Sequence, residues 1–169
     1  MNPGTPGHLV LKRLESVLDH IERVRRNALS LAESLIDQGE ESLAVALMRN
    51  ALAHDQSKLG GLERDHLAVN ADGGDRTMLE QAVAHHNRTN PHHPEYWGGI
   101  QHMPQVYLAE AVCDWKARSS EFGTSLHEWI EREAGKRYGF TSKDRVYRDI
   151  RRYVKMLVGP GFRPLRQGE

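Results

Sequence analysis

The chain has 169 residues, its 23 lysines and arginines are balanced by 23 aspartates and glutamates, and 38% of its residues are hydrophobic. This length suits one domain with a core, and the zero net charge argues against a polycation that binds nucleic acid through bulk charge. No run approaches the roughly 18 apolar residues of a membrane helix, and the single cysteine, Cys113, excludes an intramolecular disulfide and a cysteine-based zinc cluster.

Helical periodicity dominates the pattern in chain order. The first stretch places an apolar residue every three or four positions, at Leu11, Leu14, Leu18, Ile21, Val24 and Ala28. That spacing is typical of a helix with one apolar face, and we expect it to end near residue 36, with Gly39 as its C-terminal cap. Further helices are predicted over residues 41–54, 76–87, 104–119, 126–137 and 142–158. No stretch alternates with the period of a strand, so the sequence predicts a single all-α domain, a bundle of five to seven helices.

Glycine and proline mark the segments between these helices. Residues 57–74 contain two glycine pairs and are expected to form a loop with at most a short helical piece near Glu63, and residues 92–103 are expected to be irregular. The glycine- and proline-rich residues 1–8 and 159–169 are expected to form a flexible N-terminus and a tail. Residues 9–158 remain as the helical domain.

Charge is unevenly divided along the chain. Residues 136–166 hold ten basic residues against two acidic ones, whereas residues 1–135 hold thirteen basic and twenty acidic residues. The last predicted helix directs Arg145, Arg148 and Arg152 away from its apolar face. These arginines form either a solvated surface or a basic wall that receives a phosphorylated substrate, because guanidinium groups suit phosphate oxygens.

Three segments carry side chains suited to metal binding. Ten histidines occur in the chain, and seven of them lie between His54 and His102. The segments are His54-Asp55 followed by Ser57-Lys58, the run from His85-His86 to His92-His93, and Asp114 in a helix. Imidazole and carboxylate donors together suit Zn, Fe, Mn, Co or Ni. At a helix end the backbone can turn, so that one ion can bind both His54 and Asp55.

The order of these residues resembles that of the HD superfamily of metal-dependent phosphohydrolases, whose pattern is H…HD…D on a helical bundle. The resemblance covers roughly residues 14–120 and implies the metal ligands His20, His54, Asp55 and Asp114. The histidine pairs resemble the branch of that superfamily with two metal ions, which includes cyclic-dinucleotide phosphodiesterases and di-iron oxygenases. The segments HDxSK, HHxxxNPHHPEYW and EAVCDW also resemble a small family found in phages and bacteria, from which no activity can be carried over.

One histidine of each pair is the candidate for a second ion. The helical pattern does not separate His85 from His86, and we select His86 because it is nearer the helix break. His92 and His93 are as hard to separate, and we select His93. The implied cofactor is therefore one or two divalent transition-metal ions of undetermined identity.

Each candidate ligand also has a purely structural interpretation. In that interpretation, His20 is a histidine at the edge of the core, and His54-Asp55 is a helix end followed by a turn. An unpaired Asp114 would be costly to bury, which favours ligation, with Glu110 one helical turn earlier as its supporting partner. Tyr96 and Trp97 suit a packing role better than base stacking, and Cys113 suits an inert buried thiol.

The resemblance implies hydrolysis of a nucleotide or another small phosphate ester by a metal-activated water. Asp55 would orient or deprotonate that water, Lys58 and the C-terminal arginines would neutralise developing charge, and Glu63 is a lesser candidate for a general acid. Two alternatives remain: a di-iron oxygenase with the same ligands, and a non-catalytic helical protein that binds a nucleotide or a partner.

Other features bound the partners. The sequence contains no GxxxxGK[ST], GxGxxG or HExxH motif. We expect a small phosphorylated substrate, no membrane association and no stable nucleic-acid binding. The N-terminus lacks the pattern of a secretory signal, which predicts a cytoplasmic protein. We expect aromatic residues such as Trp129 to be exposed, which is compatible with a homodimer.

Overall fold

The computed structural model describes residues 6–69 and 75–159, and every regular element within these ranges is helical, which confirms the all-α prediction. The α-helices are α1 (Pro6–Asp37), α2 (Glu41–Ala53), α3 (Arg76–Thr89), α4 (Gln105–Phe122), α5 (Leu126–Trp129), α6 (Gly135–Tyr138) and α7 (Arg145–Val158). Most of the expected tail and the first five residues of the expected flexible start lie outside the described residues. Residues 6–8 of that start belong to α1.

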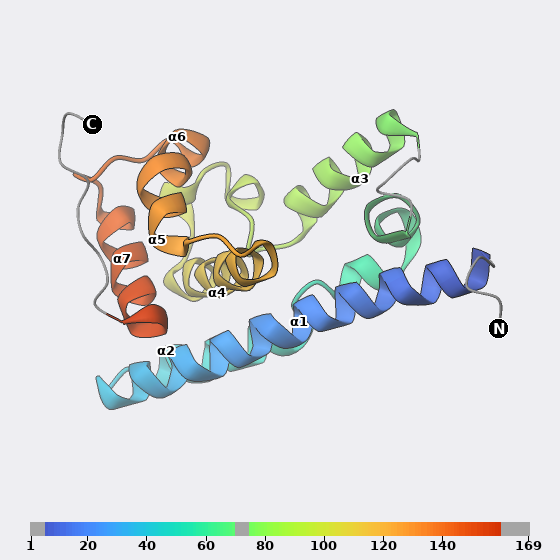
Figure 1. Ribbon diagram of the computed structural model, residues 1–169. Coiled ribbons are helices and arrows are strands. Elements are labelled where there is room, and N and C mark those ends of the chain that lie inside the picture. Colours follow the sequence, from blue (N-terminus) through green and yellow to red (C-terminus); the bar gives the residue numbers. More distant parts are fainter. Residues whose placement is uncertain (1–5, 70–74, 160–169) are drawn as a thin grey trace.

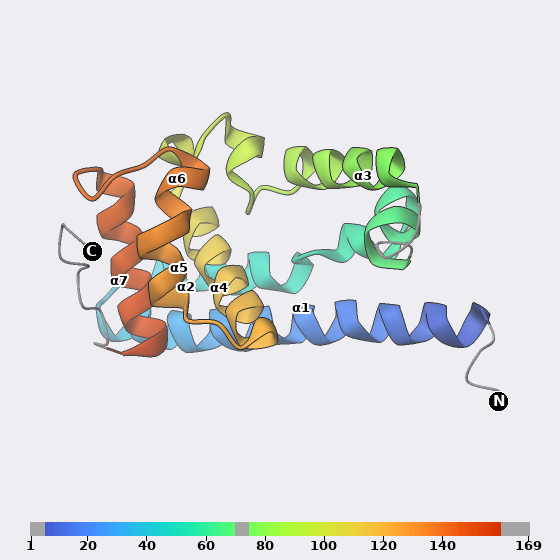
Figure 2. The same ribbon diagram turned by 45° about the horizontal axis from the view of Figure 1, so that its top comes forward.

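The long helix α1 and the returning helix α2 lie side by side along one edge of the molecule (Figures 1 and 2). Gly39 has φ +79°, and the backbone N–H groups of Gly39 and Glu40 donate to the carbonyls of Ile36 and Leu35. This left-handed turn reverses the chain at the position predicted for the cap.

Only the second part of the apolar stripe on α1 reaches the core. Its buried residues are Ile21, Val24, Ala28, Leu31, Ala32 and Leu35. Leu11 and Leu18, which the periodicity placed on the same face, are 63% and 50% exposed because the start of α1 extends beyond the bundle (Figure 2). His20 lies where the exposed part meets the buried part.

Helix α4 is the central helix of the bundle. It packs on α1, α2 and α7, and every residue from Leu108 to Trp115 is buried. Because neighbours surround this stretch on all sides, the charged residues Glu110 and Asp114 are held in the interior.

The predicted helix over residues 126–137 is interrupted by a π-helical turn, η5 (Ile130–Ala134), between α5 and α6. Beyond it, α7 buries Val146, Ile150, Tyr153 and Val154 against the core. Helix α7 lies at the opposite end of the molecule from α3 (Figures 1 and 2).

The segments expected to be irregular contain short helical turns. They are the 3-10 turns η1 (Gln56–Leu59), η3 (Pro94–Trp97) and η4 (Ile100–His102) and the π-helical turn η2 (Glu63–Val69). Across the described ranges, none of the helices is both long enough and apolar enough to cross a membrane.

Candidate metal centre

The pair His54-Asp55 lies at the end of α2, where the backbone turns sharply. Asp55 has φ +56°, a left-handed conformation that aspartate tolerates better than most residues with a Cβ atom. Both side chains consequently enter the same interior space, and the two residues are 2% and 1% exposed. The expectation that a helix end lets adjacent residues face one site agrees with this geometry.

The carboxylate of Asp55 lies between two groups of histidines. Its Oδ2 atom is 3.5 Å from Nε2 of His20 and 3.6 Å from Nε2 of His54. Its Oδ1 atom is 3.2 Å from Nε2 of His86 and 3.4 Å from Nε2 of His92. Asp114 completes the first group, with Oδ1 3.1 Å from Nε2 of His20. Asp55 is therefore placed to bridge two adjacent ligand sets.

A carboxylate lies behind three of these imidazoles. Nδ1 of His20 is 2.7 Å from Glu121, Nδ1 of His54 is 3.0 Å from Glu110, and Nδ1 of His86 is 2.7 Å from Glu63. A carboxylate that accepts the Nδ1 proton fixes the tautomer in which Nε2 carries a free lone pair. This is the arrangement that orients histidines toward a metal ion.

The atoms that face the centre have no hydrogen-bond partner among the described residues. They are Nε2 of His20, His54, His86, His92 and His93, together with Oδ1 of Asp55 and of Asp114. Buried polar atoms are normally satisfied, so seven unsatisfied atoms directed at one space require an explanation.

Divalent metal ions fit this space. Ligand atoms about 2.1 Å from a shared ion lie roughly 3 to 3.5 Å apart, close to the observed N···O separations of 3.1–3.6 Å. Three groups have donor atoms that all lie within 4.8 Å of one another: His20, His54 and Asp114; His54, Asp55 and His92; and His86, His92 and His93. The donors are imidazole nitrogen and carboxylate oxygen, the set that Zn, Fe, Mn, Co and Ni accept.

The electrostatics of the centre keep its carboxylates ionised. Burial alone would raise the pKa of Asp55 and of Asp114, but the neighbouring imidazoles outweigh burial and lower both pKa values. Burial lowers the pKa of His20, but the carboxylates of Asp114 and Asp55 outweigh it and raise that pKa to about 9, so a metal ion would have to displace the Nε2 proton to bind there. In His93, burial and the charges of His92 and His86 lower the pKa to about 3, so its imidazole is neutral.

The structure distinguishes the members of the two histidine pairs differently. His86 faces the centre, whereas the half-exposed His85 binds Glu63 through Nδ1 at 2.8 Å and does not reach Asp55. In the second pair, the selected residue His93 does face the centre, but His92 was omitted and is the more deeply buried. Both residues of this pair therefore belong to the candidate site.

The surroundings of Glu63 disagree with the expected general-acid role. Although burial by itself would raise the pKa of Glu63, hydrogen bonds from Ser57, His86 and His85 lower it, so the side chain is an ionised acceptor near neutral pH. Glu63 orients histidines. Lys58 retains a position at the centre, because its Nζ donates to Oδ2 of Asp55 at 2.5 Å.

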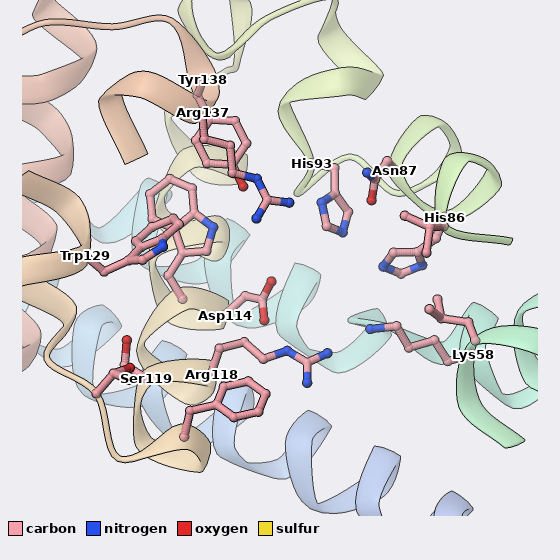
Figure 3. A pocket seen from close by; sticks show the side chains of 15 residues that line it. Lys58, His86, Asn87, His93, Asp114, Arg118, Ser119, Trp129, Arg137 and Tyr138 are labelled. Atoms are coloured by element: carbon pink, nitrogen blue, oxygen red, sulfur yellow. The ribbon is translucent and has the colours of Figure 1, made fainter. Parts of the chain in front are cut away.

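A pocket of about 390 Å³ opens beside the ligands, with Asp114, His86 and His93 in its wall. Figure 3 shows the guanidinium group of Arg137 on one side of the Asp114 carboxylate and that of Arg118 on the other, with Lys58 reaching in from α2's end of the site. Of the described residues that line the pocket, these three are the arginines and lysines, and Asp114 is the single carboxylate. The pocket therefore favours an anionic ligand.

Arg145, Arg148 and Arg152 are not among the residues of this pocket, which corrects the predicted basic wall. Arg152 donates to Gln38 and Glu40 beside the α1–α2 turn, and Arg145 lies 3.6 Å from Asp149 on its own helix. The apolar stripe of α7 fixes this orientation, because it must pack on the core and leaves the arginines on other faces.

Two expectations about aromatic residues have different outcomes. Trp97 packs, since its Nε1 donates to the Pro91 carbonyl at 2.8 Å and its ring lies 5.3 Å from that of Tyr107. Trp129, expected to be exposed, is instead half-buried against Trp115 and lines the pocket.

Beyond His92, which the sequence left unseparated from His93, three residues of the site were not predicted: Arg118, Glu121 and Arg137. Arg118 and Glu121 follow Glu110 and Asp114 at intervals of three and four residues, so helical periodicity alone placed them on the same face of α4. Arg137 had no such signal, because its position depends on the π-helical turn.

The signature of one protein family, described as a family of unknown function (DUF5662), matches residues 10–158. Neither a curated protein nor a solved structure matches the chain. The matched range contains every residue of the candidate metal centre.

Proposed function

The chain belongs to this family of unknown function, and we propose from the site that it is a metal-dependent phosphohydrolase that holds two divalent ions and acts on a small phosphate ester. The observation that carries the proposal is the set of seven buried donor atoms without partners around Asp55. The order of His20, His54-Asp55 and Asp114, which resembles the HD superfamily, agrees with it.

The residues divide into two ligand sets that share Asp55. His20, His54 and Asp114 would hold one ion, and His86, His92 and His93 the other. Such ions supply hydroxide near neutral pH and neutralise charge on a phosphate. Glu121, Glu110 and Glu63 hold the Nδ1 atoms of His20, His54 and His86, so that their Nε2 atoms face the centre.

The pocket supports phosphate as the reacting group. Lys58, Arg118 and Arg137 bring positive charge to the side of the centre that opens to solvent. Guanidinium and ammonium groups at that place would bind phosphate oxygens and stabilise the charge that develops on them. Of these cations, Lys58 also binds Asp55 and Arg118 also binds Glu121, so Arg137 is the one without a carboxylate partner among the contacts of the described residues.

The test measures metal content and phosphate release together. We expect about two ions per chain by elemental analysis, and metal-dependent phosphate release in a screen of nucleotides and sugar phosphates. Asp55→Asn keeps the side-chain shape and removes the bridging charge, so it should lose metal and phosphate release while its circular dichroism stays helical. Bound iron with dioxygen consumption and no phosphate release would replace the proposal with the oxygenase. A metal-free wild-type protein would replace it with the binding protein.

A further inference from the structure

This inference rests on the proposed function. We propose that the segment from α5 to α6 makes the site selective for phosphate esters whose alcohol part is about the size of one nucleoside and carries a flat aromatic ring. Trp129 would contact the ring, and Arg137 would contact the phosphate.

An aromatic wall closes the side of the pocket that lies away from the histidines. Trp115 and Tyr138 are stacked, with ring centroids 5.5 Å apart and an interplanar angle of 14°. Trp129 adds a third ring, 5.1 Å from Trp115 and 6.3 Å from Tyr138. Trp115 is buried, whereas Trp129 and Tyr138 are half-buried and line the pocket, so these two rings are available to a ligand.

The charges of the pocket orient a ligand relative to this wall. Arg137 lies over the ring of Tyr138, with Cζ 5.3 Å from the centroid, and Figure 3 shows its guanidinium directed toward the centre between the wall and His93. Arg118 approaches from the opposite side of Asp114 (Figure 3). A phosphate held by these cations at the metal side leaves the rest of the molecule against the rings.

The volume limits the size of that remainder. About 390 Å³ lies at the small end of the roughly 300–1,000 Å³ typical of ligand pockets. This space suits one ring system with a sugar. Flat rings bind such walls through stacking, which is tolerant of the ring's substituents.

The backbone of the segment fixes the wall in place. The π-helical turn η5 separates Trp129 from Arg137 and Tyr138, and such turns are frequent at functional sites because they shift the helical register. Gly135 follows the turn, and a Cβ atom there would lie 2.8 Å from the Phe140 carbonyl oxygen. Gly135 therefore allows the close approach of Phe140 that holds the end of the segment against the core.

The experiment compares two probes, adenosine 5′-monophosphate, which carries the adenine base, and ribose 5-phosphate, which lacks it. Binding is measured by calorimetry on the metal-loaded protein, and phosphate release is measured separately. We expect the wild type to bind the nucleotide about tenfold more tightly than the sugar phosphate, the size of effect that stacking of one base gives. Trp129→Leu should bring that ratio close to one, and Trp129→Phe, which keeps a ring, should retain most of it.

Arg137→Gln should weaken both probes by a similar factor and leave their ratio unchanged, because both carry the same phosphate. Lys136→Gln is the matched control, since Lys136 is an exposed neighbour that does not line the pocket. It should behave like the wild type.

Equal binding of the two probes by the wild type, no binding of either, or an unchanged ratio in a helical Trp129→Leu protein would each overturn the inference. Ring-selective binding without phosphate release would retain it and overturn the proposed hydrolase. Phosphate release from both probes at equal rates and with equal affinities would support the proposed hydrolase and overturn the inference of ring selectivity.

Discussion

The histidine-rich residues 54–93 and the arginine-rich helix α7 are both dense in side chains that bind ions, yet folding gives them opposite positions. Four of these histidines lie with His20 and Asp114 in one buried centre: His54, His86, His92 and His93. The arginines of α7 lie on its outer faces, and Arg152 binds Gln38 and Glu40. In these two regions, the histidines reach the centre because their helices end at the interior, whereas the arginines of α7 remain outside because that helix packs through its apolar stripe.

The largest effect is expected from removing ligands of the second set, which consists of His86, His92 and His93. The double variant His86→Ala, His92→Ala removes two donors that face Oδ1 of Asp55, so bound metal should fall from about two ions to about one, with loss of most phosphate release. Elemental analysis measures the change. His85→Ala is the control, since His85 binds Glu63 from outside and should leave about two ions. One ion in all three proteins would contradict two-ion binding.

Core substitutions in α7, at the opposite end of the molecule from α3, should change the stability of the protein and not its metal content. Ile150 of α7 is fully buried, so Ile150→Ala should lower the free energy of unfolding by about 2–5 kcal/mol, through lost burial and the cavity left behind. Ile150→Val should cost about 0.5–1.5 kcal/mol. Urea unfolding at a fixed metal concentration measures both. Loss of metal in the folded variants would show that the two ends are not independent.

A smaller effect is expected from the carboxylates behind the imidazoles. Glu110→Gln keeps the shape of the residue that lies 3.0 Å from Nδ1 of His54 but removes its charge, so metal affinity should fall about 10- to 100-fold. Competition with a chelator measures this affinity. Glu128→Gln, on an exposed position of α5, is the control. Unchanged affinity in Glu110→Gln would mean that this carboxylate does not support the ligand.

The smallest effect should come from the arginines of α7. The double variant Arg145→Gln, Arg148→Gln alters exposed side chains away from the pocket, so the KM for a phosphate ester should stay within about twofold of the wild type. Arg118→Gln, which changes a pocket residue, should raise KM about tenfold. Steady-state phosphate release at several salt concentrations measures both. A large, salt-dependent increase in KM for the α7 variant would restore the basic wall at that helix.

Local sequence determined the helical class and much of the ligand set. The three- and four-residue spacing of apolar positions fixes helices wherever one stripe can be buried, and Gly39 ends α1 because glycine adopts positive φ without strain. His54 and Asp55 could be identified together because they lie where a helix pattern ends. Helical spacing also related Glu110 to Asp114.

Tertiary structure alone decided which donors meet and which cations serve the pocket. His92 and His93 follow a helix break, where no period predicts direction, and the packing of that segment brings both to the centre. Glu63 is an orienting carboxylate because three partners surround it. Arg137 reaches the pocket through a π-helical turn, while α7 turns its own arginines outward to bury Ile150 and Val154. Direction in space depends on the packing of distant segments, and a local pattern carries no information about that packing.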